Sequence, residues 1–183
     1  MAITGTTPLD QLLAVANSYH EPEARDSGDA GGPRWLPAHD HLDGAEAALE
    51  FLGRSGINLD EAPAARHLAR LREIRSAARA LVDDPAAYER STARLLSDVE
   101  FRLDAHGRLS SGGHGWDGFT DSLLPALVEL RDHADRLKVC DNDQCRWLFI
   151  DRSKNHSRQW CESASCGNRQ RVRRFRERAG SAR

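Results

Sequence analysis

The sequence has no run of 18 consecutive apolar residues, and no basic start is followed by an apolar stretch. The first absence excludes a membrane-spanning helix, which needs about 20 mostly apolar residues. The second argues against a secretory leader. We therefore expect a cytoplasmic protein with no membrane partner. A chain of 183 residues is long enough for one or two domains with a buried core.

The signature motifs of several large enzyme classes are also absent. The sequence contains no HExxH, GxSxG or GxGxxG, and the glycine-rich residues 110–115 lack the GxxxxGK[ST] pattern of a phosphate-binding loop. Seven of the eight histidines are scattered before the first cysteine. His39 and His41 could share a metal ion, but no further ligand stands near them, and two exposed loop histidines are the favoured interpretation. We do not expect an enzyme.

The net charge of −2 hides a strong asymmetry. Residues 1–137 carry 14 Lys and Arg against 23 Asp and Glu, which gives −9, while residues 138–183 carry 12 against 5, which gives +7. Such a split favours an acidic body joined to a basic module that binds a polyanion. Solvated faces that merely differ in charge are the alternative.

Residues 1–137 have the apolar periodicity of a helical domain. We predict helices over residues 8–20, 40–53, 58–82, 85–99 and 122–137, with Pro125 in the first turn of the last one. That helix would run almost directly into Cys140 and make a rigid connection. Residues 21–34 are predicted to be a loop, and residues 100–109 a short β-hairpin with Gly107 in the turn.

The four cysteines all lie in the last quarter of the chain, as two pairs with four residues between their members: Cys140, Cys145, Cys161 and Cys166. Structural zinc sites take four protein ligands in a tetrahedron, and two short-spaced cysteine pairs supply such a set. We predict one structural Zn2+ per chain. A redox-active dithiol and a site in which His156 replaces one cysteine are the weaker alternatives, since CxxC is the usual redox spacing.

The zinc module is predicted to contain a knuckle, two strands over residues 147–150 and 158–160, and a helix from Gly167 onward. In that helix Val172, Phe175 and Ala179 recur at i, i+3 and i+7 and would pack back on the zinc core. The candidate nucleic-acid contacts are Arg169, Arg171, Arg173, Arg174, Arg176 and Arg178 on the helix, with Arg158 and Lys154 before it. Arginine suits bidentate contacts to phosphate or guanine. A solvated helix that balances the acidic body is the alternative.

One string of residues closely resembles the CGNR zinc finger: Cys140-x4-Cys145-x3-Phe149-x-Asp151-x-Ser153-x-Asn155-x2-Arg158-x-Trp160-Cys161-x4-Cys166-Gly167-Asn168-Arg169. In that family the finger usually follows an alanine-rich helical ABATE domain. Residues 8–137 resemble such a domain more loosely, with Ser18 where threonine is expected. Ser163 stands where the family commonly has methionine. The resemblance implies that the four cysteines bind zinc and that Asn168 and Arg169 order the helix start.

The expected fold is mostly α with a small α+β zinc module. Residues 1–137 would form an ABATE-like helical domain with one short β-hairpin, and residues 138–183 a treble-clef-like finger of knuckle, hairpin and basic helix. The resemblance implies a bacterial, stress-responsive transcription regulator whose finger binds DNA. Its helical domain would sense a small-molecule effector or form a homodimer. The alternative is a zinc-stabilised protein-interaction adaptor without nucleic-acid binding, and RNA in place of DNA stays open.

Overall fold

The computed structural model describes residues 7–20, 23–25, 34–36, 39–103, 107 and 109–180. The chain divides into two compact units, one formed by residues up to Tyr19 and Asp40–Asp135, the other by His20–His39 and Arg136–Arg183. The first is mostly helical and the second combines short strands with one helix. The domain boundary expected after residue 137 stays a prediction.

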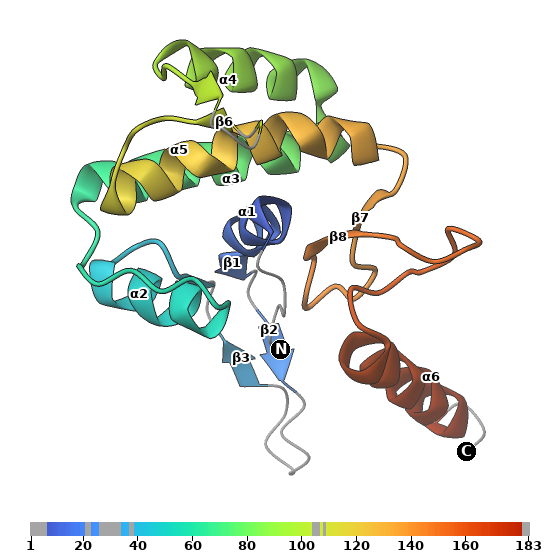
Figure 1. The fold of residues 1–183 in the computed structure, drawn as a ribbon. Helices are drawn as coiled ribbons and strands as arrows, with labels where there is room; N and C mark the ends of the chain where they lie inside the picture. Colours follow the sequence, from blue (N-terminus) through green and yellow to red (C-terminus); the bar gives the residue numbers. More distant parts are fainter. Residues whose placement is uncertain are drawn as a thin grey trace. The chain divides into compact units, whose positions relative to one another are not determined.

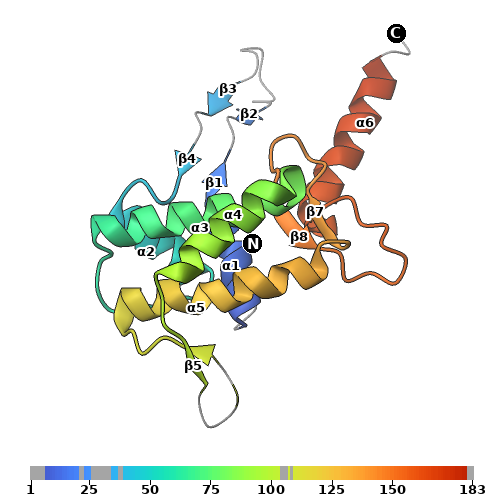
Figure 2. The same cartoon turned by 90° about the horizontal axis from the view of Figure 1, so that it is seen from above.

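In the described residues of the first unit there are five α-helices: α1 (Pro8–Ala16), α2 (Ala45–Arg54), α3 (Ala65–Asp83), α4 (Pro85–Ser97) and α5 (Gly115–Leu130). Helices α3 and α5 contact each other at its centre, and α1 and α4 each pack against both of them. Figures 1 and 2 show this arrangement within the unit. Leucines from these four helices are fully buried between them, among them Leu12 of α1, Leu71 of α3, Leu95 of α4 and Leu127 of α5.

Two helices begin at the predicted residues, 8 and 85, and each has a side-chain cap. Thr7 accepts the backbone N–H of Asp10 at 3.2 Å and Pro8 opens α1, while Asp84 accepts the N–H of Ala87 at 3.0 Å and Pro85 opens α4. Other bounds were predicted wrongly. Helix α1 ends at Ala16 instead of residue 20, and α3 begins at Ala65 instead of residue 58.

Helix α5 begins seven residues earlier than predicted, at Gly115, so that Pro125 lies inside it. A proline there costs about 3 kcal/mol, which the burial of five residues around it offsets: Leu123, Leu124, Ala126, Leu127 and Leu130. The helix also ends early. A 3-10 turn (Arg131–His133) follows Leu130, and the chain enters strand β7 (Leu137–Val139). The predicted helical connection into Cys140 is therefore wrong.

The predicted hairpin is present as β5 (Arg102–Leu103) paired with β6 (Leu109–Ser110), with Gly107 at a φ of 74° between them. Two further strand pairs were missed. Strand β1 (Tyr19–His20) pairs with β4 (His39–Asp40). Strands β2 (Glu23–Arg25) and β3 (Arg34–Leu36) are antiparallel where a loop was predicted. Residues 21, 22 and 26–33 of that predicted loop lie outside the described residues.

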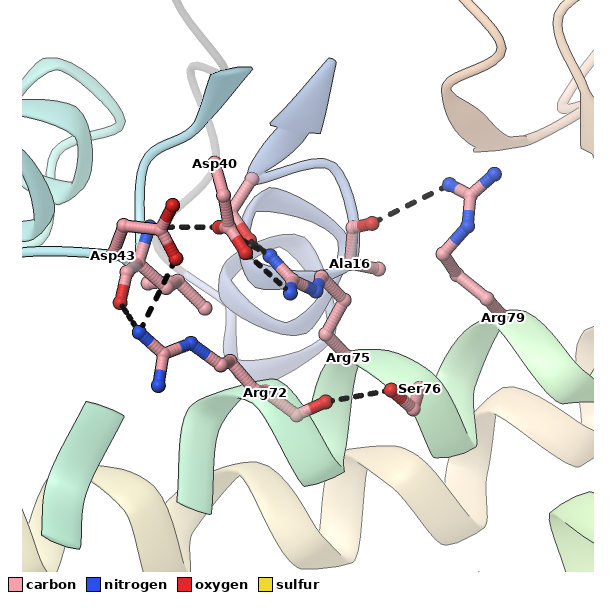
Figure 3. A network of polar contacts seen from close by, with 9 residues as sticks. Ala16, Asp40, Asp43, Arg72, Arg75, Ser76 and Arg79 are labelled. Carbon is pink, nitrogen blue, oxygen red and sulfur yellow. Dashed lines mark hydrogen bonds and ion pairs between the residues drawn. The ribbon is translucent and has the colours of Figure 1, made fainter. Parts of the chain in front are cut away.

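An ion pair in the first unit joins α3 to the segment before α2. The guanidinium of Arg75 donates to both carboxylate oxygens of Asp40, at 2.6 and 2.7 Å, and to Ser18 Oγ at 3.1 Å. Figure 3 shows Arg75 between Arg72, which donates to Leu42 O, and Arg79, which donates to Ala16 O. Burial alone would raise the pKa of Asp40, but the contact with Arg75 holds that pKa below its ordinary value.

In the second unit, β7 pairs antiparallel with β8 (Leu148–Ile150), so that Leu137 lies opposite Ile150 and Val139 opposite Leu148. The predicted pairing of residues 147–150 with 158–160 is wrong, and residues 158–160 form no strand. The physical reason is that the N–H of Arg158 donates to the carboxylate of Asp151 instead of to a strand partner. A short π-helical turn (Ser163–Gly167) leads into α6 (Asn168–Gly180).

The second unit thus keeps the predicted knuckle and basic helix, but its strand β7 precedes the knuckle instead of following it, and the treble-clef assignment stays a prediction. No helix among the described residues combines the length and the apolarity that crossing a bilayer requires.

Candidate metal centre

The four cysteines converge on one point. Cys140 follows β7, Cys145 lies in the next turn, Cys161 precedes the π-helical turn and Cys166 lies within it. Their Sγ atoms all lie within 4.8 Å of one another, with 3.6 Å from Cys145 to Cys161 and 3.7 Å from Cys161 to Cys166. A tetrahedron with Zn–S bonds of about 2.3 Å has S–S edges of about 3.8 Å. The cluster therefore fits a zinc ion.

A tight turn brings the first cysteine pair together. The carbonyl oxygen of Asn142 accepts the N–H groups of Cys145 at 2.8 Å and Arg146 at 3.1 Å, and Arg146 adopts a left-handed φ of 54°. The N–H of Cys140 then donates to the carbonyl oxygen of Trp147 at 2.8 Å. This geometry accommodates a spacing of four residues, which is at the wide end for a zinc knuckle.

The thiols differ in acidity before a metal binds. The hydrogen bond from Cys161 is the main reason that the pKa of Cys145 is lowered, to about 6. The same bond raises the pKa of Cys161, and burial raises that of Cys140 to about 11. Zinc ligation requires thiolates, so binding must release these protons, and apparent zinc affinity falls as the pH falls.

Aromatic rings surround the cluster. Phe149 is buried beside the cysteines, and Trp147 and Trp160 pack against the same group. Gly167, in the Cys166–Arg169 signature, has a steric reason to be glycine: a Cβ there would lie 3.3 Å from Cε3 of Trp160. A side chain at this position would require the indole ring of Trp160, which packs against the cysteine cluster, to shift.

Asp151 organises the loop between the cysteine pairs. Its fully buried carboxylate accepts hydrogen bonds from Lys138 Nζ at 2.7 Å and from the N–H groups of Ser153 and Arg158, each at 2.9 Å. Burial alone would raise the pKa of Asp151, but these contacts, with that of Lys138 the largest, hold it well below its ordinary value. Folding thus favours the ionised form. This stabilisation is complete above about pH 5 and is lost as the pH falls toward the folded-state pKa.

Replacement of Asp151 by asparagine removes the charge that Lys138 neutralises and puts an amide N–H₂ group among donors. Because folding of a small finger is coupled to metal binding, we expect apparent zinc affinity to fall about 10- to 100-fold at pH 7. Competition with a chromophoric chelator measures this change. The control is Asp143→Asn: its side chain is 72% exposed, pairs with Arg173 at 3.3 Å, and should leave zinc affinity unchanged. Equal affinities for wild type and Asp151→Asn would contradict the anchoring role.

The structure separates the remaining predicted site residues. His156 is absent from the metal-binding cluster, which is complete with four cysteines. Lys154 is exposed in the loop, while Arg158 lies over the Phe149 ring at 5.4 Å and donates to the carbonyl oxygen of Cys161. The arginines of α6 with described side chains are all exposed: Arg169, Arg171, Arg173, Arg176 and Arg178. The side chain of Arg174 lies outside the described residues.

Two features of the module were not anticipated from the sequence. Val172, Phe175 and Ala179 are exposed, so the prediction that they pack back on the zinc core is wrong. Gln170 of α6 is buried instead. The anchoring role of Asp151 was also missed. Its signal is an acidic residue directly after the apolar residues 147–150, within the string that resembles the CGNR zinc finger.

Residues 136–179 match the family model of the CGNR zinc finger. No curated protein matches the chain. The match and the cysteine geometry together support one structural zinc ion, bound by the module that contains Cys140, Cys145, Cys161 and Cys166. The match does not extend to the helical unit, and its likeness to an ABATE domain stays a prediction.

Proposed function

We propose that this protein is a cytoplasmic, non-enzymatic transcription regulator whose zinc finger binds duplex DNA through α6. The observation that carries the proposal is the density of arginine on that helix, six among its 13 residues. Like charges at this density destabilise an isolated helix. A polyanion supplies the missing counter-charge. Arginine suits phosphate because its planar guanidinium group donates two hydrogen bonds to the phosphate oxygens.

The finger would present this helix in a fixed position. Zinc, when bound, ties the four thiolates together and supplies folding free energy that so small a module lacks. The chain's own residues fix the start of α6: Cys166 and Gly167 are buried directly before it, and Arg171 Nε donates to the carbonyl oxygen of Gly167 at 3.3 Å. A helix held at its N-terminal end can insert into DNA with little further loss of entropy.

The helical unit would supply the regulatory input, by binding a small molecule or by forming a homodimer. An open cleft of about 500 Å³ in this unit supports the first role, with cationic and anionic side chains on its wall that include Arg66, Arg70, Asp98 and Asp117. Thermal shift of the full chain against a panel of charged metabolites tests it, and the absence of any shift would favour dimerisation.

The DNA-binding role predicts a steep salt dependence. If four arginines contact phosphates, the slope of log affinity against log salt is about −3.6, and binding weakens about 150-fold between 50 and 200 mM salt. Fluorescence anisotropy of the zinc-loaded chain with a random-sequence duplex measures this slope. Arg178→Ala should reduce its magnitude by about one.

The charge-matched control is Arg90→Ala, on the exposed side of α4, which should leave affinity and slope unchanged. A shift of the slope with Arg90→Ala but not with Arg178→Ala would place the DNA elsewhere. Failure of the zinc-loaded protein to bind any duplex at 50 mM salt would remove the role. A protein-interaction adaptor whose basic helix docks an acidic partner would then be the better account.

A further inference from the structure

Helix α6 exposes an apolar stripe that its own unit leaves uncovered. Phe175 is 74% exposed, the highest value among the large apolar side chains of the described residues, and Val172 is 42% exposed. Ala179 is also exposed. The spacing of these residues at i, i+3 and i+7 aligns them along one side of the helix. Water-exposed phenylalanine gains free energy when a partner covers it.

The stripe points away from the side by which α6 is attached. Gln170 is 6% exposed and is thus turned toward the finger, and Arg173 reaches Asp143 of the knuckle at 3.3 Å. At about 100° per residue, Gln170 lies roughly opposite the centre of the stripe. A partner can therefore reach Phe175 without displacing a contact of Gln170 or Arg173.

Arginines border the stripe on both sides. The same helical spacing places Arg169 and Arg176 along one border and Arg171 and Arg178 along the other, and all four are exposed. Arg171 is held in place by hydrogen bonds to the carbonyl oxygens of Gly167 and Ser163, each at 3.3 Å. The face thus has an apolar centre and a cationic rim on each side.

The major groove of B-DNA complements this face. It is about 12 Å wide and admits an α-helix, its walls are lines of phosphates, and the main apolar group on its floor is the C5-methyl of thymine. A helix with charge on one border alone would fit a flat anionic surface instead. Two cationic borders around an apolar centre match a groove with two anionic walls.

We propose that α6 lies in the major groove with its Val172–Phe175 stripe against base edges, and that Phe175 contacts thymine methyl groups. The two arginine pairs, Arg169 with Arg176 and Arg171 with Arg178, face the phosphates of opposite strands. The inference rests on the proposed DNA-binding function and adds a preference for thymine-containing sites. It also removes Arg173 from the DNA contacts, since that side chain pairs with Asp143.

The test compares two duplexes that differ by one methyl group per base pair, an alternating dA·dT polymer and its dA·dU counterpart. We expect the zinc-loaded full chain to bind the thymine duplex about 3- to 10-fold more tightly. Phe175→Ala should lose most of this preference and keep the salt slope. Because Phe175 is exposed, the variant should keep its zinc and its circular dichroism spectrum.

The matched control is Leu103→Ala, a large apolar side chain that is 71% exposed in the first unit, and it should keep the thymine preference. Salt-dependent binding that is equal for both duplexes would overturn the inference and leave the DNA-binding function in place. A thymine preference that survives Phe175→Ala would also overturn it. No binding to either duplex at low salt would overturn both.

Discussion

Replacement of Cys161 by serine is expected to reduce bound zinc from one ion per chain to nearly none and to unfold the finger. The Sγ of Cys161 lies 3.6 Å from that of Cys145 and 3.7 Å from that of Cys166. Its loss leaves the zinc site with three of its four thiolate ligands. Structural zinc contributes about 10–16 kcal/mol of apparent binding free energy at pH 7, and in small fingers that energy is folding energy. Zinc stoichiometry and far-ultraviolet circular dichroism measure both effects.

The matched control is His156→Asn. His156 lies at a left-handed φ of 50°, which asparagine tolerates well, so this change removes the imidazole without new backbone strain. It should keep a full complement of zinc. Retention of zinc by Cys161→Ser, or its loss from His156→Asn, would mean that the ligand set is not the four cysteines.

Replacement of Arg75 by methionine is expected to destabilise the helical unit by about 3–5 kcal/mol, because it leaves a buried carboxylate without its partner. The side chains of Arg75 and Asp40 are only 12% and 13% exposed, and two hydrogen bonds join them. The guanidinium also lies 5.8 Å from the centre of the Tyr19 ring. Urea unfolding followed by circular dichroism measures the loss.

A second change separates the ion pair from mere loss of packing. Adding Asp40→Asn to Arg75→Met should recover part of the stability, since no uncompensated charge is then buried. The control Arg54→Met breaks a pair with Glu50 whose members are 60% and 67% exposed, and it should cost less than about 0.5 kcal/mol. Because the pKa of Asp40 is depressed, the difference between wild type and Arg75→Met should persist at neutral pH and shrink below about pH 4.

The zinc site could be predicted because the type and spacing of its ligand residues indicate zinc binding. Four thiols in two short pairs admit few arrangements, and the structure confirms that their Sγ atoms meet. The helix starts at residues 8 and 85 were predicted for the same reason, since a proline opens each of these helices. In each case residue type and spacing indicate the outcome.

The features that were missed depend on contacts that residue type and spacing do not show. Strand β8 pairs with β7 and not with residues 158–160, because the carboxylate of Asp151 accepts the N–H of Arg158. The start of α5 was predicted wrongly because Pro125 was expected only in the first turn of a helix. In the structure Pro125 lies inside α5, where buried residues around it offset its cost. A close approach also supports that start: a Cβ at Gly118 would clash with the backbone of Gly113. Periodicity on α6 showed an apolar stripe, but it did not show which side faces solvent.

The second unit takes its residues from both halves of the chain, His20–His39 and Arg136–Arg183. Within it the rings of His20 and Trp147 lie 5.6 Å apart. During synthesis, the nearly one hundred residues between these segments take about 5–20 s to emerge from the ribosome. Residues 20–39 therefore cannot pack against residues 136–183 until this time has passed. Zinc binding by all four cysteines must wait longer, until Cys166 has been synthesised. Zinc can therefore complete this unit only after residues 40–135 of the helical unit have been synthesised.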